Sequence, residues 1–189
     1  MVEKITVYFA KAGEQNTDAL LKEVRKYVKK EGIKDIVIAS TTGRTGAKAA
    51  KMFKGCNVVV VGHCFGLKEP GKSELQEEYK RAILANGANI FVGTHALSSA
   101  ERAVRKDFGT ILPLELVANV LRRMGEGTKV CVEITLMAAD AGLIPIDRDV
   151  VAIGGSGRGA DTALLLRPAN AARFFDLKIR ELIAKPRDF

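Results

Sequence analysis

The chain has 189 residues, a length typical of one large domain, and 47% of them are hydrophobic, which is enough for a sizeable core. The longest apolar run, near residues 58–61, is far shorter than the about 20 residues that a membrane-spanning helix needs. No charged start, apolar run and cleavage site opens the chain as in a secretory signal. We therefore expect a single cytoplasmic domain over residues 1–189 that does not enter a membrane.

The net charge of +8 makes phosphate groups attractive partners, whether on nucleotides or on nucleic acids. The lysines and arginines are mixed with acids along the expected helix faces, and no basic stripe with interleaved aromatics occurs, which argues against nucleic-acid binding. The three cysteines, Cys56, Cys64 and Cys131, form no CxxC pair. They predict buried free thiols and neither a disulfide framework nor a metal site.

The first half of the chain alternates strand and helix patterns. Strands are expected at residues 5–9, 35–39, 57–61 and 89–92, and helices at about residues 17–30, 46–52 and 73–85. Asn16 and Thr17 can cap the first helix, and Gly32 is a common stop signal. The unbroken apolar character of residues 35–39 is typical of a strand buried on both faces of a parallel sheet.

The second half continues the alternation but contains one ambiguous segment. Helices are expected at about residues 98–104, 114–124 and 171–183, and strands at residues 149–153 and 162–167. Residues 130–134 can form a strand, yet the apolar positions of residues 128–142 fall on one helical face, so we predict a helix there. The last two strands are too close for a helical crossover, which predicts antiparallel neighbours or strands that a loop bridges at a distance.

Candidate ligand-binding residues follow the strands, because open α/β sheets bind ligands outside the carboxyl ends of parallel strands. They are Lys11, Asn16 and Thr17 after the first strand; Ser40, Thr41, Thr42, Gly43, Arg44 and Thr45 after the second; His63 and Cys64 after the third; His95 after the fourth; and Gly155, Ser156, Gly157, Arg158, Gly159, Ala160 and Asp161 after the fifth. Both glycine-rich loops carry hydroxyl groups and an arginine, a combination that favours phosphate binding.

Each of these features has a simpler interpretation as well. A glycine-rich turn after a strand is often only a turn, Lys11 can be a solvated lysine, and the arginines can pair with neighbouring carboxylates. The chain's two histidines, His63 and His95, can be structural. The Walker pattern is absent, and Gly155-x-Gly157-x-x-Ala160, a permissive dinucleotide fingerprint, leads into a strand where such a fingerprint should open a helix.

Two stretches of the chain together resemble the C-terminal domain of pyruvate kinase. Residues 36–50 (IVIASTTGRTGAKAA), followed by the strand at residues 57–61, resemble the strand, Thr/Ser-x-Gly-Arg-Ser/Thr phosphate loop and helix of that domain. Residues 141–166 are similar to its closing section, and the resemblance covers about residues 16–167. It implies a three-layer α/β/α sandwich with a mostly parallel mixed sheet whose last strand is antiparallel.

The resemblance also implies a ligand. The family's two loops hold the phosphates of a sugar-bisphosphate effector, which implies residues 41–45 as one cradle and residues 156–159 as a second candidate. The kinase barrel is absent, so kinase activity is not implied. The extra strand at residues 5–9 and the long stretch at residues 94–127 look closer to a small, mainly archaeal family of stand-alone pyruvate kinase α/β domain-like proteins. Similarity to that family implies flavin mononucleotide (FMN).

We therefore expect a protein that binds FMN or a similar nucleotide, with His63, Cys64 and His95 near the ring or the ribose. One alternative is an enzyme acting on a small phosphorylated metabolite, with His63 or His95 as acid or base, because histidine titrates near neutral pH. The other is a regulatory module that senses a phosphometabolite and signals through a homo-oligomer.

Overall fold

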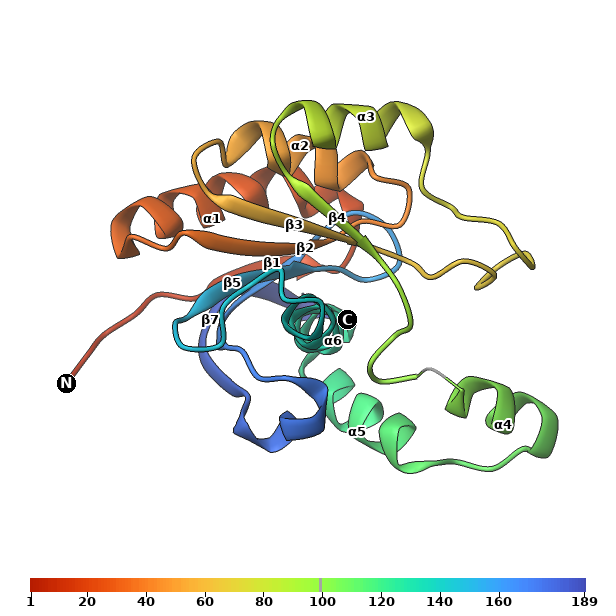
Figure 1. Ribbon diagram of the computed structural model, residues 1–189. Coiled ribbons are helices and arrows are strands. Elements are labelled where there is room, and N and C mark those ends of the chain that lie inside the picture. The colour runs from red at the N-terminus through yellow and green to blue at the C-terminus, as the bar shows by residue number, and fades with distance from the viewer. Residues whose placement is uncertain (99) are drawn as a thin grey trace.

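A seven-stranded mixed sheet crosses the molecule in the order β1-β7-β6-β5-β2-β3-β4 (Figure 1). The computed structural model describes residues 1–98 and 100–189. The strands are β1 (Val7–Lys11), β2 (Asp35–Ala39), β3 (Asn57–Gly62), β4 (Asn89–Val92), β5 (Val150–Gly154), β6 (Thr162–Arg167) and β7 (Lys178–Asp188). Strand β6 is antiparallel to both of its neighbours, β5 and β7, whereas the other strand pairs are parallel.

Helices cover both faces of this sheet. They are α1 (Thr17–Glu31), α2 (Arg44–Met52), α3 (Glu77–Ala85), α4 (Glu101–Phe108), α5 (Pro113–Leu121) and α6 (Glu126–Asp140). Helices α1, α2 and α3 lie on one face and α6 on the other, with α4 and α5 farther out on the α6 side (Figure 1). This arrangement confirms the predicted α/β/α sandwich. Within the described residues, no helix combines the length and the apolar character needed to cross a membrane.

The strands carry apolar side chains on both faces of the sheet, so both faces pack against helices. Side chains alternate between the two faces of a strand, so Ile36 and Ile38 of β2 pack with α1, α2 and α3, while Val37 packs with α6. Helix α6 is almost wholly buried, from Gly127 to Ala139, because it lies between the sheet and α5. The helix prediction for this ambiguous segment is therefore confirmed.

The helical connections change from one face of the sheet to the other at the β2–β5 pair. Helix α2 follows β2 on one face, whereas α6 precedes β5 on the other. In open α/β sheets such a change of face leaves a crevice at the carboxyl ends of the two strands. The loops that follow β2 and β5 border this crevice, and a short hairpin joins β5 to β6 as the predicted antiparallel pair requires.

Several element boundaries differ from the expectation. Strand β1 begins two residues later than predicted, and α3 begins at Glu77 and not at Ser73, whose Oγ accepts a hydrogen bond from the Leu75 N–H (3.2 Å). The hydroxyl thus forms a local turn in place of a helix cap. The helix predicted at residues 98–104 is found as α4, and the part of that prediction at Ser99 lies outside the described residues.

The predicted terminal helix at residues 171–183 is wrong. A 3-10 turn (Ala171–Asp176) is followed by β7, which is inserted between β1 and β6. Leucine, glutamate and lysine favour helices locally, but pairing with strands on both sides outweighs this weak preference. Strand β7 also provides the partner for β1, so the extra N-terminal strand lies at the edge of the sheet.

The substitution Ala184→Asp tests the placement of β7. Ala184 is fully buried in an apolar cluster and pairs with Val7 of β1 and Ala163 of β6, so a carboxylate there would be removed from solvent. We expect the free energy of unfolding to fall by at least about 3 kcal/mol, measured by urea denaturation. The exposed control Arg187→Asp should change it by less than about 0.5 kcal/mol. Equal, small effects at both positions would contradict the buried strand.

Candidate functional site

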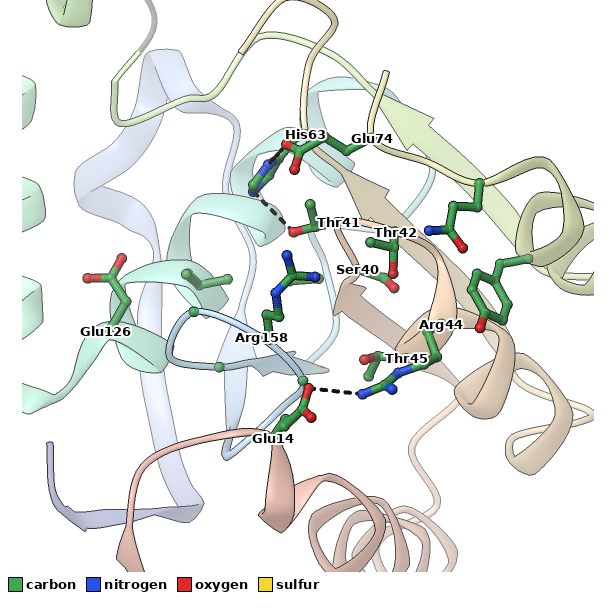
Figure 2. Close-up of a pocket in the computed structure, with 17 residues that line it drawn as sticks. Glu14, Ser40, Thr41, Thr42, Arg44, Thr45, His63, Glu74, Glu126 and Arg158 are labelled. Carbon is green, nitrogen blue, oxygen red and sulfur yellow. Dashed lines mark hydrogen bonds and ion pairs between the residues drawn. The ribbon is translucent and has the colours of Figure 1, made fainter. Parts of the chain in front are cut away.

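A cavity of about 760 Å³ opens at the carboxyl ends of β2 and β5, where the two glycine-rich loops face each other (Figure 2). Its lining is Glu14, Ala39, Ser40, Thr41, Thr42, Arg44, Thr45, His63, Glu74, Gln76, Tyr79, Glu126, Val130, Gly155, Gly157, Arg158 and Gly159. The first loop (residues 40–43) leads from β2 into α2, and the second loop (residues 155–161) leads from β5 into β6. The cavity therefore occupies the crevice that the topology of the sheet creates.

The first loop presents unpaired backbone donors. Gly43 adopts a left-handed conformation (φ 94°), and the Gly46 N–H donates to Ser40 Oγ (3.0 Å) at the start of α2. The N–H groups of Gly43, Arg44 and Thr45 have no acceptor among the described residues. Since the first turn of a helix leaves such donors free and carries the positive end of the helix dipole, this loop suits an anion.

Gly43 also allows α3 to approach the first loop. A Cβ at this position would lie 2.6 Å from Tyr79 Cβ and 2.8 Å from Leu75 Cδ1, so a larger residue would push α3 away. The close approach brings the Tyr79 side chain to the wall of the cavity.

The second loop is held from beneath by a buried carboxylate. Asp161 Oδ2 accepts the N–H groups of Gly13 (2.9 Å) and Ser156 (3.2 Å), and its Oδ1 accepts the Thr162 hydroxyl (2.8 Å). The Ala160 N–H donates to Thr17 Oγ1 (2.9 Å). These contacts tie the loop to the connection between β1 and α1, so Thr17, Ala160 and Asp161 shape the loop and do not line the cavity.

The two arginines of the cavity are in different situations. Arg44 Nη2 lies 2.9 Å from Glu14 Oε2, an ion pair that is about half exposed on both sides. Such an exposed ion pair contributes little to stability, so a phosphate can take the place of the Glu14 carboxylate at Arg44. Arg158 extends into the cavity and has no carboxylate at ion-pair distance within the described part of the chain (Figure 2). Its guanidinium is therefore free to bind a ligand.

Three carboxylates of the lining were not predicted from the sequence. Glu14 pairs with Arg44, Glu126 Oε2 accepts from Arg122 Nε (2.6 Å), and Glu74 Oε2 lies 2.8 Å from His63 Nδ1. Glu14 lies three residues after the end of β1, so the search of segments that follow strands could have found it. Glu74 and Glu126 come from a long loop and from the start of α6, and only the folded chain brings them to this edge.

The second histidine lies behind the first. The His95 ring is 5.3 Å from the His63 ring between centroids, but its side chain is only 12% exposed and does not line the cavity. Its Nδ1 is 3.7 Å from Glu133 Oε2, which Lys129 Nζ also contacts at 2.5 Å. Burial lowers the pKa of His95, and the nearby His63 and Lys129 charges act in the same direction against the attraction of Glu133.

The predicted site residues divide into two groups. Those that line the cavity are Ser40, Thr41, Thr42, Arg44, Thr45, His63, Gly155, Gly157, Arg158 and Gly159. Those that do not are Lys11, Asn16, Thr17, Gly43, Cys64, His95, Ser156, Ala160 and Asp161. Lys11 is exposed at the end of β1, where its backbone oxygen accepts from Asn16 Nδ2 (2.7 Å). The structure thus brings together the core of both loops and His63, but not the residues after β1.

The fold and the two loops agree with a comparison to known families. The family model of the pyruvate kinase alpha/beta domain matches residues 18–166, and the chain belongs to this family. Among solved structures, a pyruvate kinase from Cryptosporidium parvum is 13% identical, with a TM-score of 0.40, over 81% of this chain and 23% of that chain. A Cryptosporidium parvum pyruvate kinase in complex with ADP is 12% identical, with a TM-score of 0.38, over 87% and 24%. The chain thus spans less than a quarter of the length of these kinases.

The lowered pKa of His95 predicts a specific pH dependence of stability. The folded state disfavours the imidazolium, so as the pH falls below the ordinary value of about 6.5 the unfolded chain takes up the proton first. Stability should therefore fall with pH in this window, and it should fall less steeply in His95→Gln. Urea midpoints of both proteins between about pH 7.5 and pH 5.5 test this. Parallel curves would show that His95 does not contribute.

Proposed function

We propose that the protein binds a phosphate-bearing small molecule in the cavity at the carboxyl edge of its sheet, and that this molecule is FMN. The observation that carries the proposal is the convergence of two glycine-rich loops, each with hydroxyls and an arginine, on one cavity. Membership of the pyruvate kinase alpha/beta domain family supports it, because the resemblance assigns phosphate binding to these loops. We also propose that the protein acts in the cytoplasm and is related to the mainly archaeal stand-alone members.

The phosphate would lie between the start of α2 and Arg158. Arg44 and Thr45, whose N–H groups are unpaired among the described residues, line one side of this space, and the Arg158 guanidinium offers two parallel donors from the other. The hydroxyls of Thr42 and Thr45 add further donors on the lining. Backbone N–H groups, an arginine and hydroxyls are the donors that commonly bind a phosphate monoester.

The rest of the cavity can accept the remainder of FMN. A volume of about 760 Å³ falls within the range of ordinary ligand pockets. Tyr79 offers an aromatic ring, and Thr41 and Gln76 offer polar groups for a ribityl chain or ring edge. When bound, the flavin would supply redox chemistry, and the chain's own residues would bind it and orient it. His63 would lie beside the ligand, whereas Cys64 and His95 would lie outside the first layer of contacts.

The first prediction for this site concerns Arg158→Ala. We expect FMN to raise the melting temperature of the wild-type protein in a saturable way, and the substitution to weaken binding roughly tenfold to 100-fold. The reason is the loss of charged hydrogen bonds, which contribute about 1.5–3 kcal/mol. Arg25→Ala, at an exposed position on α1, serves as the matched control and should bind like the wild type.

The same titration decides between FMN and other phosphate compounds. A yellow protein, or a saturable shift with FMN that Arg158→Ala weakens, supports the flavin. A shift with sugar phosphates or inorganic phosphate but none with FMN would retain the phosphate site and reject the flavin. If none of these compounds stabilises the protein, the proposed function is wrong.

A second prediction concerns Glu14→Gln. The Glu14 carboxylate occupies Arg44 and adds negative charge to the cavity, so it competes with an incoming phosphate. We expect the neutral variant to bind FMN several-fold more tightly, with the gain decreasing as salt screens the charges. Glu23→Gln on α1 is the control for a general change of net charge. Weaker binding by Glu14→Gln would show that Glu14 contacts the ligand favourably.

A further inference from the structure

One wall of the cavity carries a hydroxyl, an imidazole and a carboxylate in line. Thr41 Oγ1 lies 3.3 Å from His63 Nε2, and His63 Nδ1 lies 2.8 Å from Glu74 Oε2 (Figure 2). The three residues come from the first loop, the end of β3 and the loop before α3, and all three line the cavity. Phosphate binding alone uses none of these contacts.

The contact with Glu74 determines which nitrogen of His63 is free to act. A carboxylate only accepts hydrogen bonds, so Nδ1 carries the proton that Glu74 binds, and Nε2 is left as an acceptor on the side of Thr41. A base oriented in this way by a third group is the arrangement found in acid–base and nucleophilic active sites.

We propose that this cavity is an acid–base catalytic site in which His63 Nε2 removes a proton from a small phosphate ester, at a carbon next to a carbonyl group. The C–H bond breaks, the proton moves to Nε2, and the electron pair moves to the carbonyl oxygen as an enolate forms. Return of a proton to the same or the neighbouring carbon restores His63. The step needs no oxidant and no second substrate. It rests on the phosphate-binding part of the proposed function and not on the flavin.

The surroundings of His63 favour this class of reaction. An enolate oxygen gains negative charge, and the Arg158 guanidinium, which has donors beyond the two assigned to the phosphate, is on the same cavity and can stabilise it. The phosphate loops would hold the ester in place, which makes the proton transfer effectively intramolecular. A histidine can accept and return a proton near neutral pH, as reversible enolisation requires.

His95 is excluded from this role by its position. It does not line the cavity, and its carboxylate partner Glu133 is already paired with Lys129. Glu74, by contrast, contacts His63 directly and acts through it, so we assign it as a positioning residue. The assignment predicts different effects for the two histidines, and for Glu74 a lower rate of exchange with unchanged binding.

Hydrogen–deuterium exchange tests the proposal. Dihydroxyacetone phosphate is incubated with the protein in D₂O, and loss of the signals from the hydrogens next to the carbonyl group is followed by proton NMR. We expect the wild-type protein to accelerate exchange at least about 100-fold over buffer, and His63→Asn to abolish this acceleration. His95→Asn should exchange like the wild type, and unphosphorylated dihydroxyacetone should exchange slowly because it lacks the anchor.

Glu74→Gln separates positioning from a structural contact. We expect exchange to become about tenfold slower at a saturating concentration of dihydroxyacetone phosphate, with the affinity for this compound unchanged, because His63 loses the contact that orients it. A merely structural contact would leave the rate at saturation unchanged or would lower the melting temperature. Melting temperatures of all variants, with and without dihydroxyacetone phosphate, report folding and binding in the same samples.

The outcomes distinguish the two proposals. Binding without exchange, or exchange that survives in His63→Asn, overturns the acid–base assignment and leaves phosphate binding in place. Loss of exchange in His95→Asn but not in His63→Asn also overturns it. Neither binding nor exchange, with FMN equally without effect, overturns both proposals. Exchange that is lost in His63→Asn while binding persists, and lost together with binding in Arg158→Ala, supports the acid–base assignment and the phosphate-binding part of the proposed function.

Discussion

The carboxylate of Asp161 is the contact on which the candidate site depends. It is fully buried and pairs with no cation in the described part of the chain, so its charge is satisfied by the N–H groups of Gly13 and Ser156 and by the Thr162 hydroxyl. These three donors belong to the connection after β1, the second loop and β6. A single side chain thus fixes the second loop against the N-terminal part of the molecule, and the position of Arg158 follows from it.

Positive and negative groups lie in separate, neighbouring regions of the cavity. The start of α2 and Arg158 make one region positive, while Glu14 and Glu74 keep negative charge next to it. A ligand that carries a phosphate at one end and an uncharged, polar remainder would match both regions. Most residues that would hold a ligand are thus separate from those that could act on it. Substitutions can therefore alter ligand binding and catalysis independently.

The sequence predicted the parts of this fold that depend on local patterns. The apolar face of residues 128–142 identified α6, the short connection between β5 and β6 gave the observed antiparallel pair as one of two arrangements, and glycine with arginine identified both loops. It did not predict β7, whose residues favour a helix locally and become a strand only between two partners. It also missed Glu74 and Glu126, since their approach to the loops depends on how distant segments pack.

The pairing of β1 with β7 has a consequence for the order in which the protein can assemble during its synthesis. Among the described residues, β1 has only β7 as a neighbour in the sheet, and β7 is made after all the other strands. Strand β1 must therefore wait, with its backbone groups unpaired, while β2 to β6 form their own sheet. The central part of the domain can fold as the chain emerges, but the edge next to the second loop closes only after β7 has been made.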